Sequence, residues 1–166
     1  MNRTCNIAIE WGYRPGSIGR IAQLHSTYYH REWGFGLYFE AKVATELSEF
    51  LRRYDEKRDG IWLALVDGTV EGAVVIDGIH AEDRGAHLRW FIVSDRLRGQ
   101  GVGRRLLDRA IDFCADRGYK QVYLWTFEGL HAARHLYEAA GFRQIEARKG
   151  NSWGIEVTEQ RFLRQG

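Results

Sequence analysis

A glycine-rich stretch, RLRGQGVGRRLL at residues 96–107, constrains the fold of this chain more than any other feature. Gly99, Gly101 and Gly103 alternate with other residues, arginines lie on both sides, and an apolar run with helical spacing follows at once. Glycine lets the backbone turn tightly and approach a ligand closely, and the first N–H groups of a helix have no partner within it. The stretch therefore predicts a phosphate-binding turn where a strand leads into a helix, rather than a plain connection.

The apolar pattern on both sides of this turn predicts alternating strands and helices. Residues 86–95 and 120–127 have the pattern of strands and residues 101–118 that of an amphipathic helix, so the two strands should be parallel with a right-handed crossover. Asp67-Gly68 separates two further strand-like runs, which is typical of a hairpin. The predicted order along the chain is β-α-α-β-β-β-α-β-α-β-β. The other segments that carry this order are helices over 16–33, 38–56 and 130–141 and strands over 142–149 and 155–163.

Length and composition bound the class of protein. The chain has 166 residues, 45% of them hydrophobic and 13% aromatic, which fits one globular domain over residues 1–166. The formal net charge of +2 gives no reason to expect a nucleic-acid or membrane partner, and no apolar run is long enough to span a bilayer. Cys5 and Cys114 lie far apart and outside any C-x-x-C pattern, so we expect reduced thiols and a cytoplasmic location.

The spacing of the glycines excludes two common nucleotide-binding motifs. A dinucleotide fingerprint counted from Gly99 needs a glycine at position 104, which is arginine, and a P-loop needs a lysine after the last glycine. The pattern that fits is R-x-x-G-x-G, from Arg98 to Gly103. In this context it resembles the coenzyme A pyrophosphate loop of the GCN5-related N-acetyltransferase (GNAT) superfamily.

The resemblance extends beyond the loop. In the family the next helix, strand and helix end in a pattern like LYEAAGF, which stands here at residues 136–142, and the order of elements matches over nearly the whole chain. Residues 124–142 are similar to the acetyltransferase halves of bacterial MarR–GNAT fusions, although this chain carries no such DNA-binding half. Many members carry asparagine seven residues before the tyrosine of this pattern, and here that position is Leu130.

The resemblance implies a GNAT-like α/β fold, with a mixed and mostly antiparallel sheet flanked by helices. It also implies an acetyl-CoA-dependent N-acetyltransferase, in which acetyl-CoA is the co-substrate and a primary amine attacks it directly in a ternary complex. The expected acceptor is a small-molecule or peptide amine, and a homodimer is left open. The alternative is a non-catalytic acyl-CoA-binding sensor or regulatory module, which would keep the loop and lose turnover.

The resemblance assigns roles to particular residues as well. Tyr137 stands where the family's tyrosine protonates the leaving coenzyme A thiolate, although the same residue taken alone fits a core tyrosine on an amphipathic helix. Main-chain groups of the fourth strand would bind the pantetheine arm and polarise the thioester carbonyl. The cofactor-binding residues that the resemblance predicts are Phe91, Ile92, Val93, Arg98, Gly99, Gln100, Gly101, Val102, Gly103, Arg104 and His131.

An amine acceptor must lose a proton, because an alkyl ammonium with a pKa of about 10 is neutral in only about one part in a thousand at pH 7. His87 is the predicted general base, since its unperturbed pKa is suitable and strict alternation along the strand puts it on the same face as Phe91. A solvent-facing strand histidine is the alternative. The acidic candidates, which we interpret as solvated surface, are Glu32, Glu40, Glu82 and Asp83.

Two further groups of residues carry a weaker signal. His131 and His135 have the i, i+4 spacing of a zinc site but lack the glutamate and a third ligand, so we expect no metal. The N-terminal aromatic residues fit either a wall of the acceptor pocket or a core between two helices. They are Tyr28, Tyr29, Trp33, Phe35, Tyr38 and Phe39.

Overall fold

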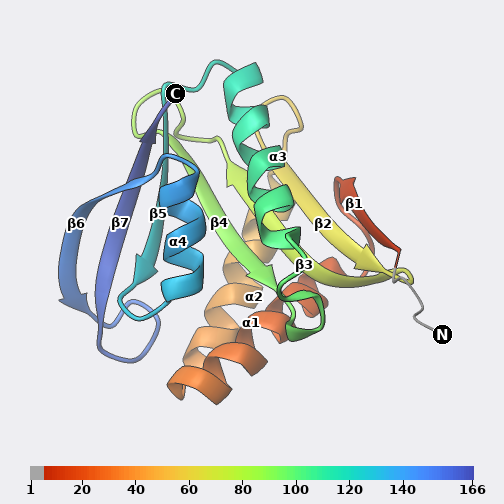
Figure 1. Cartoon of the computed structure of the whole chain (residues 1–166), viewed down its shortest axis with the longest axis vertical. Helices are drawn as coiled ribbons and strands as arrows, with labels where there is room; N and C mark the ends of the chain where they lie inside the picture. Colours follow the sequence, from red (N-terminus) through yellow and green to blue (C-terminus); the bar gives the residue numbers. More distant parts are fainter. Residues whose placement is uncertain (1–5) are drawn as a thin grey trace.

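The computed structural model of the chain describes residues 6–166, and its elements follow the predicted order (Figure 1). A short 3-10 helix, η1, lies between β4 and α3. Cys114 is a free, buried thiol in α3, and Cys5 lies outside the described residues. The elements are β1 (Ile7–Trp11), α1 (Ser17–Trp33), α2 (Leu37–Arg52), β2 (Gly60–Val66), β3 (Thr69–Asp77), β4 (Ala86–Val93), η1 (Asp95–Leu97), α3 (Val102–Asp116), β5 (Gln121–Phe127), α4 (His131–Ala139), β6 (Arg143–Gly150) and β7 (Val157–Gln165).

The seven strands of residues 6–166 lie in one sheet with the order β1-β2-β3-β4-β5-β7-β6. Every neighbouring pair is antiparallel except β4 and β5, which are parallel and joined through α3. Helices α1 and α2 cover one face of the sheet, and α3 and α4 cover the other (Figure 1). The mixed, mostly antiparallel sheet flanked by helices is therefore confirmed.

The two faces of the sheet have separate cores. Strand β2 is buried along its whole length because helices lie on both sides of it. Under α1 and α2 the largest buried side chains include Leu47 and Phe50, and under α3 they include Leu106 and Leu107. The turn at Asp67-Gly68 has positive φ at both residues, 49° and 78°, as a tight hairpin requires.

Strands β4 and β5 separate soon after they begin. Their parallel pairing is limited to Ala86 with Val122 and His87 with Tyr123, although β4 continues to Val93. The main chain of β4 beyond His87 consequently has no strand partner on the β5 side. The separation opens the sheet between its two faces, which positions the candidate site described below.

A β-bulge in β4 changes which side chains share a face. Val75 pairs with Arg89 and Ala73 with Ile92, so Trp90 and Phe91 together oppose one residue of β3, and Trp90 has a φ of +46°. Phe91 therefore packs toward α3 and α4, whereas Trp90 packs against Phe50 of α2.

The bulge corrects one prediction. Strict alternation placed His87 on the face of Phe91, but the extra residue at the bulge inverts the alternation between them. Arg89, two residues after His87, reaches Glu46 of α2, so His87 lies on the face of α1 and α2. The placement of His87 beside Phe91 was wrong.

The fold makes a testable prediction at Gly78, directly after β3. A Cβ there would overlap the carbonyl oxygen of Arg58, and the Gly78 N–H donates to the fully buried Asp59 at 2.9 Å. We expect Gly78→Ala to lower the free energy of unfolding by about 1–3 kcal/mol, measured by chemical denaturation. The control is Gly19→Ala in α1, where a Cβ meets nothing within 4 Å and stability should stay equal or rise. Equal stability of both variants would contradict the prediction.

Candidate active site

The three glycines of the β4–α3 turn have different tasks. Gly99 and Gly101 adopt left-handed φ values of 74° and 73°, and a Cβ at either position would meet nothing within 4 Å. Gly103 lies inside α3, where its Cβ would be 3.1 Å from Leu136 of α4 and 3.4 Å from Phe91. The first two glycines thus shape an open turn, and the third lets α3 approach α4 closely.

The turn presents free N–H groups at the start of α3. The first hydrogen bond of the helix runs from the Arg105 N–H to the Gly101 carbonyl at 3.1 Å, and no side chain caps the helix. The N–H groups of Val102, Gly103 and Arg104 therefore have no acceptor within the helix. Val102 as a whole is 1% exposed, whereas Gly103 is partly exposed and Gly101 and Arg104 are exposed. Such a cluster of donors at a helix N-terminus can bind an anion.

Contacts to other elements hold the turn in place. Leu97 is 1% exposed, and the Ser94 N–H donates to the Glu71 carbonyl at 2.7 Å. The buried Glu71 carboxylate also pairs with Arg20 and Arg96, at 3.1 and 3.5 Å. These contacts fix the residues that precede the glycines to β3 and α1.

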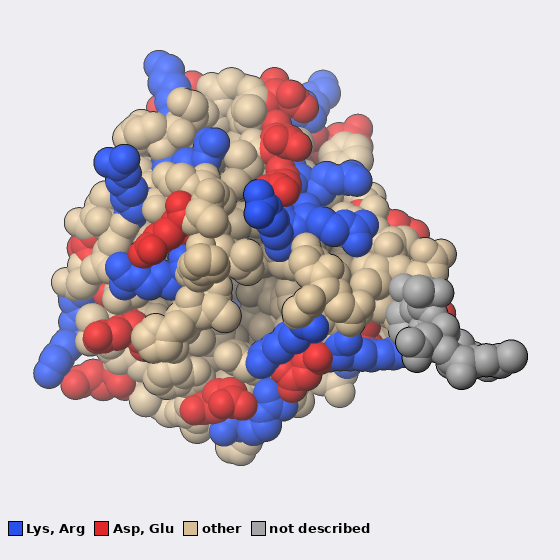
Figure 2. All heavy atoms as spheres, in the orientation of Figure 1, with Lys and Arg blue, Asp and Glu red and all other residues tan. Residues whose placement is uncertain are grey.

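Positive charge surrounds the turn. Arg98 pairs with Asp95 at 3.0 Å and lies 4.9 Å from the centre of the Tyr28 ring. Arg104 is exposed on α3. Figure 2 shows a hollow between α3 and α4, with Lys and Arg side chains on the part of its rim that lies over the β4–α3 turn. Of the predicted phosphate-binding residues, Arg98, Gly99, Gln100, Gly101 and Arg104 are exposed at this turn.

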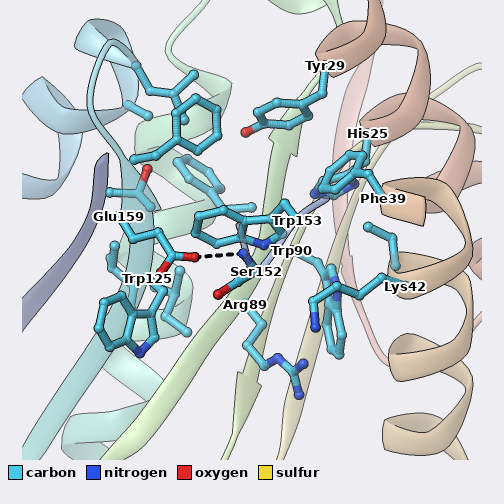
Figure 3. Close-up of a pocket in the computed structure, with 18 of the residues that line it drawn as sticks. His25, Tyr29, Phe39, Lys42, Arg89, Trp90, Trp125, Ser152, Trp153 and Glu159 are labelled. Atoms are coloured by element: carbon cyan, nitrogen blue, oxygen red, sulfur yellow. Dashed lines mark hydrogen bonds between the residues drawn. The ribbon is translucent and has the colours of Figure 1, made fainter. Parts of the chain in front are cut away.

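A cavity of about 330 Å³ lies where β4 and β5 separate. Its lining includes Tyr137 and Ala133 of α4 on one side of the sheet, and His25 and Tyr29 of α1 with Phe39 of α2 on the other (Figure 3). The cavity consequently connects the face covered by α3 and α4 with the face covered by α1 and α2.

Two tyrosines meet in this cavity from opposite faces. Tyr137 is 6% exposed and packs against Phe91, with ring centres 5.8 Å apart, and in Figure 3 the Tyr29 hydroxyl points into the pocket. Burial raises the pKa of Tyr137, and the nearby Tyr29 raises it further. Burial likewise raises the pKa of Tyr29. Both phenols stay protonated at neutral pH and can donate a proton or a hydrogen bond.

His87 lies in the cavity but is poorly suited to act as a base. Its ring is partly buried and stacks on Tyr123 with centres 4.4 Å apart. Burial and the positive charge of Arg89 lower the pKa of His87 to about 3. A ring with so low a pKa accepts a proton from an ammonium group far less readily than an ordinary histidine does, so this lowered pKa argues against His87 as the general base.

His25 is a cavity residue that the sequence analysis missed. Its Nδ1 lies 2.8 Å from the Ile21 carbonyl, which can only accept, so Nδ1 carries the proton and Nε2 keeps a lone pair. Burial lowers the pKa of His25 to about 4. The only signal in the sequence was a histidine within an apolar helical stripe, which is also the pattern of a buried structural histidine.

A chain of charged groups lies at the other end of the cavity. Glu46 of α2 accepts from Lys42 at 2.6 Å and from Arg89 at 2.8 Å, and the Arg89 guanidinium lies 4.0 Å from the centre of the Trp90 ring. In Figure 3 the ends of Lys42 and Arg89 lie at the opposite end of the pocket from Tyr29. These contacts join α2 to β4 and were not predicted, because the partners lie 43 residues apart.

A buried glutamate holds the β6–β7 loop over the cavity. Glu159 of β7 is 2% exposed and accepts from the Ser152 N–H at 3.1 Å and from Arg148 at 3.4 Å (Figure 3). The next loop residue, Trp153, packs against Phe127 with ring centres 5.7 Å apart. The loop therefore adds an aromatic wall on the face of α1 and α2.

The remaining predicted residues have mixed placements. Of the N-terminal aromatic residues, Tyr29 and Phe39 line the cavity and Phe35 is buried core, so both open alternatives hold in part. His131, the first residue of α4, is exposed.

Among residues 6–166 no cluster of three His, Cys, Asp or Glu side chains is arranged to bind a metal. The same residues include no helix that is long and apolar enough to cross a bilayer. The acidic candidates, none of which lines the cavity, are Glu32, Glu40, Glu82 and Asp83.

Comparison with known proteins assigns the family. Residues 18–142 match the model of the acetyltransferase (GNAT) family, which is most of the chain. The chain belongs to the GNAT family. This match confirms the resemblance to GNAT proteins that the glycine turn indicated. Nothing shows a relation to MarR–GNAT fusions.

Curated relatives of this GNAT chain are themselves described as N-acetyltransferases. An uncharacterized N-acetyltransferase from Archaeoglobus fulgidus is 27% identical over 94 residues, which is 54% of this chain and 64% of the archaeal protein. Human N-acetyltransferase 8B is 30% identical over 112 residues, which is 64% of this chain and 49% of the human protein. The chain thus spans less than two thirds of these relatives.

Solved structures agree with the GNAT fold over almost the whole chain. An acetyltransferase from Streptococcus agalactiae superposes with a TM-score of 0.74 at 19% identity, covering 96% of this chain and 98% of the other. A GNAT family acetyltransferase from Elizabethkingia anophelis, solved with acetyl-CoA bound, gives a TM-score of 0.68 at 18% identity, covering 97% and 99%. At this identity the likeness establishes the fold.

The lowered pKa of His25 predicts loss of stability in acid. The contribution of neutral His25 to the free energy of unfolding is complete above the pKa of about 6.5 that a histidine has in the unfolded chain. It is lost as the pH falls from there toward about 4, because in this range the unfolded chain binds a proton that the buried ring does not. Between pH 7 and pH 5 we expect His25→Gln to remove about 2 kcal/mol of the acid-induced fall in the free energy of unfolding.

Denaturant titrations at pH 7, 6 and 5 measure this difference. His87, whose pKa is also lowered, titrates in both proteins, so the comparison isolates His25. Parallel pH profiles for the wild type and the variant would contradict the neutral, buried state of His25.

Proposed function

We propose that this GNAT chain is an N-acetyltransferase that transfers the acetyl group of acetyl-CoA to a primary amine by direct attack in a ternary complex. The observation that carries the proposal is the cavity between β4 and β5, which joins the face of the phosphate-binding turn to the face of α1 and α2. Such a passage lets two substrates enter from opposite faces and meet within the sheet. The described N-acetyltransferase activity of relatives and the acetyl-CoA in the Elizabethkingia anophelis structure support it.

The cofactor side is built mainly from main-chain groups. The pyrophosphate binds the N–H groups of the turn, with Arg98 and Arg104 adding positive charge. Gln100 is exposed in the same turn, and His131 lies at the start of α4. The pantetheine arm runs along the edge of β4 that has no strand partner. The residues of that edge which bind it are Phe91, Ile92 and Val93.

The reaction needs one group that donates a proton to the leaving thiolate and one that donates a hydrogen bond to the oxyanion. The amine nitrogen forms a bond to the thioester carbonyl carbon, and the resulting oxyanion accepts a hydrogen bond from the free main chain of β4. Collapse breaks the carbon–sulfur bond, and the thiolate takes the proton of the Tyr137 hydroxyl. The tyrosine is then restored from solvent, which receives the proton that the amine loses.

Deprotonation of the amine falls to water in the cleft rather than to a strong base. His25 and His87 are both neutral and weakly basic, because burial lowers the pKa of each. The free lone pair on His25 Nε2 accepts a hydrogen bond from the amine and so orients it. His25 is a positioning residue in this proposal.

Other predictions from the sequence accompany this function. Residues 1–166 act as one acetyltransferase domain, which the single sheet across residues 6–166 supports. A cytoplasmic location, a small-molecule or peptide acceptor, a homodimer and a functional link to MarR-type regulators stay predictions. Purified protein with acetyl-CoA and a panel of amines tests the activity through coenzyme A release and product masses. Tight acetyl-CoA binding without release would favour the sensor alternative.

The phosphate-binding turn is tested by a pair of glycines at the two ends of α3. Gly101 and Gly118 have φ values of 73° and 70°, and a Cβ at either meets nothing within 4 Å, so alanine strains both backbones alike. We expect Gly101→Ala to weaken acetyl-CoA binding at least about 10-fold, because it displaces N–H groups that bind pyrophosphate. Gly118→Ala should keep the wild-type affinity. Calorimetric affinities that fall equally in both variants would contradict this assignment.

The role of Tyr137 is tested by removing its hydroxyl. The Tyr137 hydroxyl makes no hydrogen bond within residues 6–166, so Tyr137→Phe should leave the melting temperature and acetyl-CoA affinity nearly unchanged. We expect kcat to fall by about 10²–10⁴-fold, as for a lost general acid. Tyr119→Phe is the control, because its hydroxyl donates to the Arg58 carbonyl at 2.8 Å away from the cavity, and it should lose stability and keep kcat. A normal kcat in Tyr137→Phe would exclude it as the proton donor.

A further inference from the structure

The acceptor face of the cavity carries a cluster of charged groups that the proposed chemistry does not use. The cluster consists of Lys42 and Glu46 of α2, Arg53 after α2, Asp77 of β3 and Arg89 of β4. Glu46 bridges Lys42 and Arg89, at 2.6 and 2.8 Å. Asp77 binds both nitrogens of the Arg53 fork, at 3.0 and 2.5 Å, and lies 3.4 Å from Arg89.

The cluster has one positive charge more than its carboxylates neutralise. Three cationic side chains share the two carboxylates. Burial raises the pKa of Asp77, but the ion pair with Arg53 lowers it more, so the pKa of Asp77 lies below its usual value. Asp77 is therefore ionised, and the Glu46 carboxylate is held between Lys42 and Arg89. Glu49, exposed on α2, and Asp59, paired with Arg58 at 3.2 Å, act on Arg53 only through space, and neither forms an ion pair with the cluster among the described residues.

Neighbouring groups do not cancel this charge. His87, between the cluster and β5, is neutral because of its lowered pKa. Arg161 of β7 stacks on Tyr123 at 4.8 Å, and its buried Nε has no hydrogen-bond partner. Arg148 and Glu159 balance each other at 3.4 Å. The field on this side of the cavity is consequently positive.

The cationic groups keep donors for a ligand. Lys42 and Arg89 line the cavity and are 30% and 20% exposed, and most of their N–H groups have no acceptor in the cluster. Between them and Tyr29 the wall is aromatic, formed by Phe39, Trp90 and Trp153 (Figure 3). The cavity thus has a positive end, an apolar middle and an end next to Tyr137.

We infer that the acceptor is a primary amine with a single carboxylate and an apolar or aromatic body, and that Lys42 and Arg89 bind the carboxylate. A purely cationic amine would meet unfavourable charge at this end, whereas a carboxylate completes the neutralisation of the cluster. A guanidinium beside an ammonium is also a suitable carboxylate site, because both donate charge-assisted hydrogen bonds. This inference rests on the proposed acetyl transfer and names the class of its acceptor.

Matched acceptor pairs test the inference in the intact protein. Phenylalanine with phenethylamine places the carboxylate next to the amine, and 4-(aminomethyl)benzoate with benzylamine places it at the far end. In at least one pair we expect kcat/KM, from coenzyme A release, to be at least about 10-fold higher for the carboxylate member. If the partner without a carboxylate is as good or better in both pairs, the inference fails while the acetyltransferase activity stands.

Charge-neutralising variants connect the preference to the cluster. Arg89→Gln and Lys42→Gln should each lower the ratio of the two kcat/KM values by about 10-fold and leave acetyl-CoA affinity unchanged. Arg52→Gln removes a charge from an exposed site on α2 outside the cavity and should leave the ratio as in the wild type. Two variants in separate elements guard against one that fails to fold, and the acetyl-CoA affinity of each reports folding. A wild-type ratio in both folded variants would overturn the assignment.

A binding experiment separates this inference from the proposed activity. Calorimetry measures N-acetylphenylalanine against N-acetylphenethylamine, and the N-acetylated product of 4-(aminomethyl)benzoate against that of benzylamine, on protein saturated with coenzyme A. If no amine is acetylated, the proposed function fails, yet tighter binding of a carboxylate member still supports a carboxylate-binding subsite at Lys42 and Arg89. Equal or weaker binding of both carboxylate members overturns the subsite whatever the turnover.

Discussion

Strands β4 and β5 are hydrogen-bonded at Ala86–Val122 and His87–Tyr123 and then separate. In a continuous sheet each strand satisfies the main-chain groups of its neighbour, and an interior edge without a partner is costly unless solvent or a ligand replaces it. The break leaves such an edge inside the domain and opens the cavity through the sheet. The cavity can connect the two faces of the sheet only because this pairing stops, so the candidate site depends on the separation of β4 and β5.

The bulge at Trp90 complements the separation. It adds a residue to β4 opposite β3 and so inverts the direction of the side chains along the strand. Before the bulge, His87 and Arg89 face α2, and after it Phe91 faces α3 and α4, where it packs against Tyr137. One strand therefore supplies polar side chains, the charged Arg89 among them, to the acceptor face and an apolar wall to the cofactor face.

The parts of the fold that depend on local sequence were predictable. The order of helices and strands follows from apolar spacing, and the tight turn before α3 follows from Gly99 and Gly101 between a strand and a helix. The bulge was not predictable, because the sequence around Trp90 contains no glycine or proline to mark it. His25 and Glu46 were missed for another reason. Each becomes part of the site only through contacts with elements that lie far away in the sequence.

This difference follows from how the two faces bind. In the proposed function the cofactor face uses main-chain N–H groups and a helix N-terminus, whose requirements are few and leave a short motif of glycines in the sequence. The acceptor face uses side chains from α1, α2, β4 and the β6–β7 loop, which no single motif connects. A change at Lys42 or Trp153 would alter acceptor recognition and leave the turn intact. The shared motif therefore identifies the family, and only the assembled cavity can indicate which amine enters it.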